Sequence, residues 1–282
     1  MYVEMLNSNK LLPLTQALNQ IESQKRSSDI VAFLFSLVGD KVGNNKAFNF
    51  LEKLEANDRL RYVFIIFYGA ILYFIAKSMK AQGLKKPLTL AFSGNGAHSL
   101  KIVSNDPETV GKFAQLIFDG VYNDGTHTKI QVIMEENPKK ATCKGGILSP
   151  DSQDYDSIRS IKTIFLGDEF EKPTDKDLTY SQITHEMEAG VLNSVTDFFT
   201  FLFDLHKNND DFFCEYLSAD PTIFDQVKEL CMDKTQLQQS LQQGLDLKRK
   251  EVTDATRIEE TMFFYPLITI LHDLAMKIGQ MK

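Results

Sequence analysis

Residues 88–100 read LTLAFSGNGAHSL, and this stretch contains the most informative local feature of the sequence. A short apolar run follows Pro87 and ends at a turn that contains Gly94 and Gly96. A run of this length between proline and glycine is typical of a buried strand. Two glycines directly after a strand let the backbone approach a ligand closely, and a helix that begins there would direct free N–H groups toward an anion. We therefore expect a strand and then a ligand-approaching turn.

The segment before this strand has the pattern of a long apolar helix. Asn57 or Asp58 can cap its start, because either side chain can accept hydrogen bonds from the free N–H groups of a first turn. Its end is expected near Gln82, with Gly83 in the left-handed conformation that ends many helices. The charge-free part is about 15 residues long, whereas a membrane span needs about 20. We therefore expect a helix buried under a sheet and no membrane insertion.

The segment after the glycine turn predicts a helix and then a second strand. Asp106 and Pro107 form a strong helix start. Its apolar face consists of Val110, Phe113, Ala114, Ile117 and Phe118. Residues 129–136, KIQVIMEE, then alternate apolar and polar side chains as a half-buried strand does. This order of helices and strands favours an α/β fold with a largely parallel or mixed sheet flanked by helices.

The remaining chain divides into three parts by composition. Residues 1–57 have helical spacing and form a helical lead-in to the α/β part, which extends to residue 148. Residues 149–180 are rich in Asp and Ser and are expected to be a linker with one possible strand, IKTIFLGD. Residues 181–282 predict an all-α extension, in which Pro266 is expected to bend or break the last helix. An apolar stripe of that extension consists of Val191, Val195, Phe198, Phe199 and Leu202.

Composition narrows the classes of function. The chain has 282 residues and a formal net charge of -7, which argues against a nucleic-acid binder because such proteins normally present a basic face. Its three cysteines, at positions 143, 214 and 231, form no CxxC pair, so we expect free thiols and a cytoplasmic protein. The first 20 residues include Glu4 and Lys10, and we expect no secretory signal there.

Side chains that could perform catalysis or bind a metal form no strong motif. The stretch THEME places His185 and Glu188 three residues apart but lacks the second histidine of a helical zinc site. His206 and His272 have apolar neighbours, and lone histidines of this kind are usually packing or surface residues. Ser93 has a glycine on one side only, and a nucleophilic Cys143 would need a histidine that the fold brings close. We therefore predict no catalytic residue and no metal site.

Two motifs together resemble a known family. The stretch LTLAFSGNGAHSL looks like the adenosine-side strand and glycine turn of the actin, sugar-kinase and 70-kDa heat-shock chaperone ATPase superfamily. About 40 residues later, NPKKATCKGG is similar to the chaperone segment in which Asn-Pro opens a helix. The matching residues are Asn137, Pro138, Ala141, Gly145 and Gly146. The resemblance covers about residues 58–148, and the order of the elements contributes as much to it as the motifs.

The resemblance implies a ribonuclease H-like ATPase half and a nucleotide site. Gly94, Asn95 and Gly96 match the turn that approaches the sugar and α-phosphate of ATP or ADP. His98 stands where the chaperones place an arginine against the adenine, and an imidazole could stack there. The half that supplies the phosphate turn and the magnesium-holding aspartate has no counterpart before residue 58. The chain is therefore expected to be a fragment or a truncated relative, inactive alone, whose intact parent binds Mg²⁺ and changes conformation with its nucleotide.

Two other classes of function stay open from the sequence. Leu237, Leu241 and Leu245 follow one side of a Gln-rich helical stretch and could dock a partner helix, which would make the chain a non-enzymatic interaction or scaffold protein. The same leucines could instead pack inside their own chain. A helix-rich enzyme with a site assembled from distant residues is the third reading, and no motif favours it.

Overall fold

The computed structural model describes residues 58–92, 100–134, 179–251 and 261–280. Residues 57–282 form one compact unit and residues 1–56 another, and only the first of these contains described residues. The predicted lead-in (1–57), the Asn-Pro segment and the predicted linker strand all lie outside the described residues. The predicted domain boundary within residues 149–180 therefore stays a prediction.

Helix α5 (Asp58–Ala81) is the long apolar helix that the sequence predicts. The helix ends at Gly83, which has a φ of 69°. The N–H of Leu84 donates to the carbonyl of Met79 at 2.9 Å, which is the 6→1 hydrogen bond of a Schellman motif. The sequence analysis judged the apolar segment too short to cross a membrane, and this was wrong. The helix extends beyond the charge-free residues and is long enough. By length and composition Arg61–Ala81 could span a bilayer, but half of its most apolar window is buried inside the fold.

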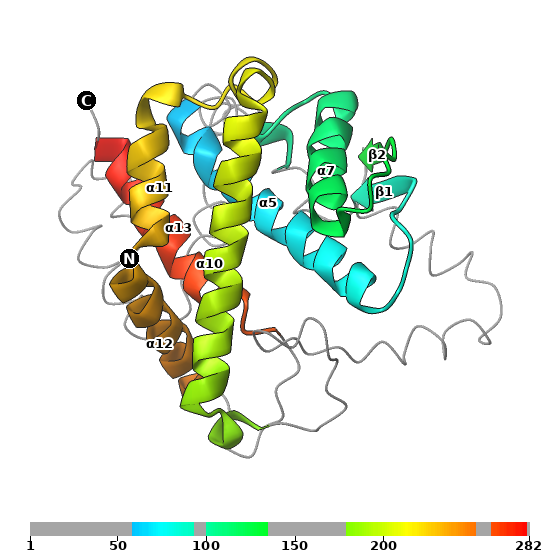
Figure 1. Ribbon diagram of the computed structural model, residues 1–282. Helices are drawn as coiled ribbons and strands as arrows, with labels where there is room; N and C mark the ends of the chain where they lie inside the picture. Colours follow the sequence, from blue (N-terminus) through cyan, green and yellow to red (C-terminus); the bar gives the residue numbers. More distant parts are fainter. Residues whose placement is uncertain (1–57, 93–99, 135–178, 252–260, 281–282) are drawn as a thin grey trace, which may run out of the picture. The chain divides into compact units, whose positions relative to one another are not determined.

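A parallel strand pair follows α5. Strand β1 (Thr89–Phe92) leads through a short 3₁₀ turn, η1 (Leu100–Ile102), and helix α7 (Pro107–Tyr122) to strand β2 (Gln131–Met134). The two strands pair in parallel, with Thr89 opposite Gln131 and Phe92 opposite Met134. Both predicted strands and the helix start at Asp106 and Pro107 are confirmed, and Figure 1 shows α7 beside the two strands.

The strand pair buries one of its faces. Val132 is buried, and Leu90 packs against the main hydrophobic cluster, whereas Thr89, Gln131 and Ile133 on the alternate positions are exposed. Helix α7 contacts both β2 and α5, so the buried face of the strands and two helices form one layer of the core. The five predicted apolar residues of α7 are all fully buried. The sequence pattern therefore identified the core side of this unit correctly.

The described residues from 180 onward are helical, as predicted. The 3₁₀ turn η3 (Tyr180–Gln182) precedes α10 (His185–Asn208), which is followed by the π-helical turn η4 (Phe212–Tyr216) and the 3₁₀ turn η5 (Pro221–Ile223). Helices α11 (Phe224–Met232), α12 (Lys234–Glu251) and α13 (Phe264–Gln280) complete the chain. The prediction for Pro266 was wrong: it lies in the first turn of α13, where no N–H is needed, so the helix continues past it.

The C-terminal helices share a core with α5 and α7. Four residues of the predicted stripe on α10 (Val195, Phe198, Phe199 and Leu202) belong to the same hydrophobic cluster as the buried faces of α5 and α7. Tyr73 of α5 packs against the rings of Phe198 and Phe201 at 5.3 and 5.1 Å. Leu237, Leu241 and Leu245 are at most 1% exposed, so the leucine stripe packs inside its own chain. The described part of the protein is thus a helix-rich α/β fold with a two-stranded parallel sheet.

Candidate functional site

The parallel pairing brings the ends of the two strands that precede the resembling motifs to one edge of the sheet. Parallel strands end on the same side, and ligands of α/β folds bind outside those carboxyl ends. Phe92 and Met134 are paired and are the last residues of their strands. Gly94 comes two residues after Phe92 in the chain, and Asn137 comes three residues after Met134. The two strands that precede the motifs in sequence therefore end side by side.

Gly94, Asn95, Gly96 and His98 lie outside the described residues, so their arrangement stays a prediction. The chain is fixed on both sides of them. Phe92 packs against the main hydrophobic cluster, and Leu100 and Val103 are fully buried. The described residues on both sides of these seven positions are therefore held by the core.

The start of α7 is capped by its own chain. The Asp106 carboxylate accepts hydrogen bonds from the N–H of Glu108 at 3.2 Å and from the N–H of Thr109 at 3.0 Å. It also accepts from the Thr109 hydroxyl at 2.7 Å, and these bonds lower the pKa of Asp106. A helix end that already holds a carboxylate has little left to offer a phosphate. The start of α7 therefore has few free N–H groups left for an anion.

Close contact fixes α7 on β2. A side chain at Gly111 would bring its Cβ within 2.5 Å of the Ile130 carbonyl oxygen, a backbone atom that cannot rotate away. Only glycine allows this approach of helix to strand. Because Ile130 directly precedes β2, this contact holds α7 close to the amino end of that strand.

The opposite, amino end of the strands is held by a charged cluster centred on Lys86, whose side chain is 4% exposed. Its ammonium donates to Asp119 at 2.8 Å, to Asp124 at 3.1 Å and to the Thr126 carbonyl at 2.6 Å. Burial by itself would lower the pKa of Lys86, but the bonds to Asp119 and Asp124 outweigh it and raise that pKa. We call Lys86, Asp119, Asp124 and Thr126 the Lys86 cluster.

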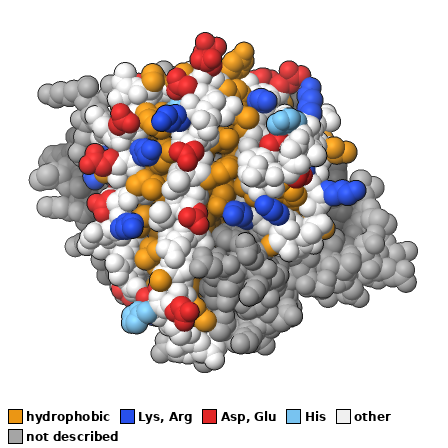
Figure 2. Space-filling model, in the orientation of Figure 1, with side chains coloured by type: hydrophobic (Ala, Val, Ile, Leu, Met, Phe, Trp, Pro, Cys, Tyr) orange, Lys and Arg blue, Asp and Glu red, His pale blue; other side chains and the backbone are white. Residues whose placement is uncertain are grey.

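A hollow of about 700 Å³ lies between the first half of α7 and β2. Its described lining includes Leu88 and Thr89 and the charged side chains of Glu108, Lys112 and Lys129. On the face shown in Figure 2, basic and acidic side chains are interspersed with narrow apolar streaks. Neither feature points to a particular ligand.

Of the histidines in the C-terminal half, His185 and His272 are surface residues and His206 is a buried packing residue. His185 is exposed and hydrogen-bonded to Glu188 at 3.0 Å, and His272 is mostly exposed. His206 is buried, and burial lowers its pKa to about 4 although the Asp210 carboxylate opposes this. The sequence analysis treated these histidines one at a time. It therefore missed that His206, Asp210 and Cys214 recur every fourth residue, a spacing that places them on one helix face.

Comparison with known proteins identifies no family. No family model matches the chain, and neither the curated proteins nor the solved structures contain a significant match.

Proposed function

We propose that this chain is the adenosine-side half of an actin-like or heat-shock-chaperone-like ATPase and binds ATP or ADP at the carboxyl edge of β1 and β2. The observation that supports this best is the parallel pairing of β1 with β2 across α7. An antiparallel pair would have separated the segments after Phe92 and Met134. The parallel pair starts both from the same edge.

The order of elements supports the proposal as well. The superfamily resemblance implies a long apolar helix, a strand, the glycine turn, a helix and a second strand, in that sequence. Helix α5, strand β1, helix α7 and strand β2 follow in this order, with the glycine turn between β1 and α7. In this proposal Gly94, Asn95 and Gly96 approach the sugar and α-phosphate, and His98 stacks on the adenine.

The proposed activity of the isolated chain is binding without hydrolysis. Phosphoryl transfer depends on positioned phosphates and a metal ion, which the other half of such an ATPase supplies. In an intact protein the two halves would close on Mg²⁺ and nucleotide. This closure would be the nucleotide-dependent conformational change by which the protein acts. The isolated chain should bind ADP weakly and hydrolyse ATP no faster than background.

The test is a fluorescent-ADP titration of the full chain and two glycine variants. Gly96→Val adds a branched side chain where the backbone is proposed to meet the nucleotide, and we expect affinity to fall by about tenfold or more. Gly125→Asn is the matched control, because Gly125 has a φ of 71°, which asparagine tolerates, and nothing lies within 4 Å of its would-be Cβ. The control should bind like the parent.

Three results would contradict the proposal. They are the absence of ADP binding at millimolar nucleotide, equal effects of the two glycine variants, and ATP hydrolysis well above background by the chain alone. The scaffold alternative gains no support from the leucine stripe, because Leu237, Leu241 and Leu245 are buried against their own chain. A protein partner for the C-terminal helices stays a prediction that rests on other surfaces.

A further inference from the structure

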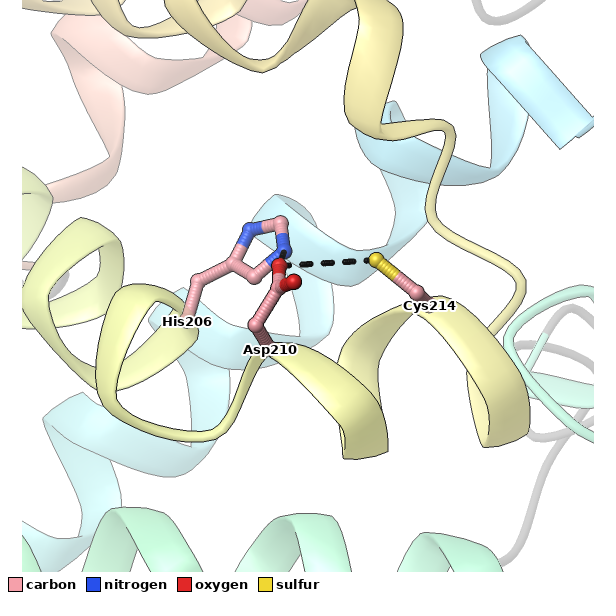
Figure 3. A group of neighbouring side chains, drawn as sticks. All are labelled: His206, Asp210 and Cys214. Atoms are coloured by element: carbon pink, nitrogen blue, oxygen red, sulfur yellow. Dashed lines mark hydrogen bonds and ion pairs between the residues drawn. The ribbon is translucent and has the colours of Figure 1, made fainter.

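Three side chains with different metal-binding atoms meet where α10 runs into the π-helical turn η4. His206 Nε2 lies 3.5 Å from Asp210 Oδ1, and Cys214 Sγ lies 3.5 Å from the same oxygen. All three ligand atoms lie within 4.8 Å of one another. Figure 3 shows the imidazole and the thiol on either side of the carboxylate, all directed toward one point. We call these residues the His206 cluster.

The separations in the His206 cluster also suit metal ligands. The distance between His206 Nε2 and Asp210 Oδ1 exceeds the usual 2.7–3.2 Å range of an N–H···O bond, and the Cys214 thiol donates a hydrogen bond to the same oxygen at 3.5 Å. Tetrahedral zinc, with bonds of about 2.0–2.3 Å, sets its N, O and S ligand atoms about 3.3–3.6 Å apart. The third pair, His206 and Cys214, lies within 4.8 Å, so the Cys214 side chain would have to rotate toward the imidazole to bind the same ion.

We propose that His206, Asp210 and Cys214 form a zinc site with one coordination position left for water. The donor set of imidazole, carboxylate and thiolate suits zinc, whereas magnesium and calcium take oxygen ligands almost exclusively. The site can be reached from solvent, since the Asp210 side chain is 65% exposed. Nothing in the proposed nucleotide function depends on this site, which lies on different elements.

The imidazole of His206 is held in one orientation before any ion arrives. Its ring stacks on Phe213 at 4.4 Å and meets the edge of Phe224 at 4.6 Å, and its side chain is only 4% exposed. A ring fixed between two aromatic side chains loses little further freedom when its nitrogen binds a metal. The side chains of Asp210 and Cys214 then adjust to this fixed ring.

A buried hydroxyl next to the His206 cluster gives an independent reason for a ligand there. Tyr62 is 2% exposed, its ring centre lies 5.8 Å from that of His206, and its hydroxyl has no hydrogen-bond partner among the described residues. Burial raises the pKa of this hydroxyl, so it stays protonated and needs an acceptor. Buried polar groups without a partner are rare, and a metal-bound water would satisfy this one.

The backbone of the same segment departs from the α-helix. The N–H of Leu217 donates to the carbonyl of Phe212 at 3.2 Å, a bond across five residues that defines the π turn. Such turns are uncommon and occur frequently at functional sites. Here the π turn contains Cys214 and Phe213, whose ring stacks on His206.

The experiment is a Co²⁺ titration of the full chain, because cobalt substitutes for zinc and its bond to a thiolate absorbs in the near ultraviolet. We expect a charge-transfer band with tetrahedral visible bands, both removed by added Zn²⁺. Cys214→Ser should abolish the charge-transfer band. Asp210→Asn should weaken Zn²⁺ binding by at least about tenfold, the lower end of the loss seen when support for a metal ligand is removed.

Two further variants make the result specific. Asp211→Asn changes the neighbouring exposed carboxylate, which lies outside the His206 cluster, and should bind zinc like the parent. Tyr62→Phe removes the hydroxyl without a partner, so zinc affinity should fall while stability without zinc holds or rises. Urea unfolding without metal confirms that each variant is folded.

The proposal is overturned if the parent shows no cobalt–thiolate band at micromolar protein. A band retained by Cys214→Ser would overturn it as well, because the thiolate would then be Cys143 or Cys231. Equal losses for Asp210→Asn and Asp211→Asn would show a general charge effect in place of coordination.

Discussion

The two ends of the β1–α7–β2 unit differ in how their polar groups are used. At the amino end, the Lys86 ammonium is almost fully buried and bonded to Asp119, Asp124 and a backbone carbonyl, so the cluster is satisfied within the chain. At the carboxyl end, Asp106 caps α7 with its side chain, and the glycine turn follows β1 directly in sequence. In parallel α/β folds the amino end contributes mainly to stability and the carboxyl end binds ligand. The distribution of polar contacts here follows that division.

The largest expected effect comes from breaking the contact between α7 and the residue just before β2. Gly111→Val would force α7 away from β2, because its Cβ would stand 2.5 Å from the Ile130 carbonyl oxygen. We expect a loss of about 3 kcal/mol in the free energy of unfolding, at the upper end of overpacking costs. Urea unfolding followed by circular dichroism measures it.

Gly69→Ala is the matched control for this prediction. Its Cβ would meet the Leu202 methyl groups at 3.3 and 3.5 Å and the Phe113 ring at 3.6 Å, and only the first distance is tight. The leucine side chain can shift, and alanine gains about 1 kcal/mol of helix propensity over glycine. We expect a change near zero. Equal destabilisation by both variants would mean that α7 is not fixed by the contact at Gly111.

The success of sequence reasoning in this unit has a local cause. The strand after Pro87, the start of α7 at Asp106 and the stop at Gly83 all depend on neighbours within a few residues, and the chain shows these directly. The apolar face of α7 is likewise a matter of spacing. Pro266 was misjudged because its effect depends on where the helix begins, and a shift of one turn changes a helix breaker into a first-turn residue.

The contacts that sequence reasoning missed join residues far apart or of mixed type. Lys86 meets Asp119 across 33 positions, a pairing that no local pattern encodes. The His206 cluster is local in sequence, but its three residue types match no named motif, and its candidacy depends on the π turn and the buried hydroxyl of Tyr62. The nucleotide residues Gly94, Asn95, Gly96 and His98 lie outside the described part of the chain, so the parallel edge is the part of that prediction with structural support.

The next largest effect tests the amino end alone. Lys86→Met keeps the length of the side chain but leaves Asp119 and Asp124 without their shared cation. Breaking a buried pair costs about 3–5 kcal/mol, and the partial exposure of both carboxylates reduces this to about 2 kcal/mol here. Nucleotide affinity should not change, since the cluster lies at the opposite end from the glycine turn.

Lys85→Met controls for loss of a positive charge, because Lys85 is exposed. It should unfold like the parent. If Lys86→Met weakened ADP binding as much as Gly96→Val does, the proposal that the amino end serves stability and the carboxyl end binds nucleotide would be wrong.

The pH dependence of stability sharpens the assignment of the amino end. Hydrogen bonds from Thr126 and Lys86 lower the pKa of Asp124, and bonds from Lys86, His127 and Gln115 lower that of Asp119 against the effect of burial. Groups with lowered pKa values stabilise the fold above their unfolded value of about 3.9, and this contribution is lost as pH falls through the folded values. The raised pKa of Lys86 adds stability below about 10.4, which is lost as pH rises through its folded value.

The measurable quantity is the difference in unfolding free energy between the parent and Lys86→Met across pH. It should be greatest between about pH 5 and pH 9 and shrink at both extremes. A difference that is flat from pH 3 to pH 11 would show that the variant acts through lost packing and not through the ion pairs.

The smallest expected effect tests the carboxyl end. Asp106→Ala removes the cap from α7, so the N–H groups of Glu108 and Thr109 must turn to water. Stability should fall by less than in Lys86→Met, and Asp106→Asn should restore part of it, because its single amide oxygen can replace one of the two carboxylate oxygens that accept these bonds. The uncapped helix end would also become available to an anion, so sulfate should stabilise Asp106→Ala more than the parent. Equal sulfate stabilisation of the two proteins would mean that the end of α7 is closed to anions by more than its cap.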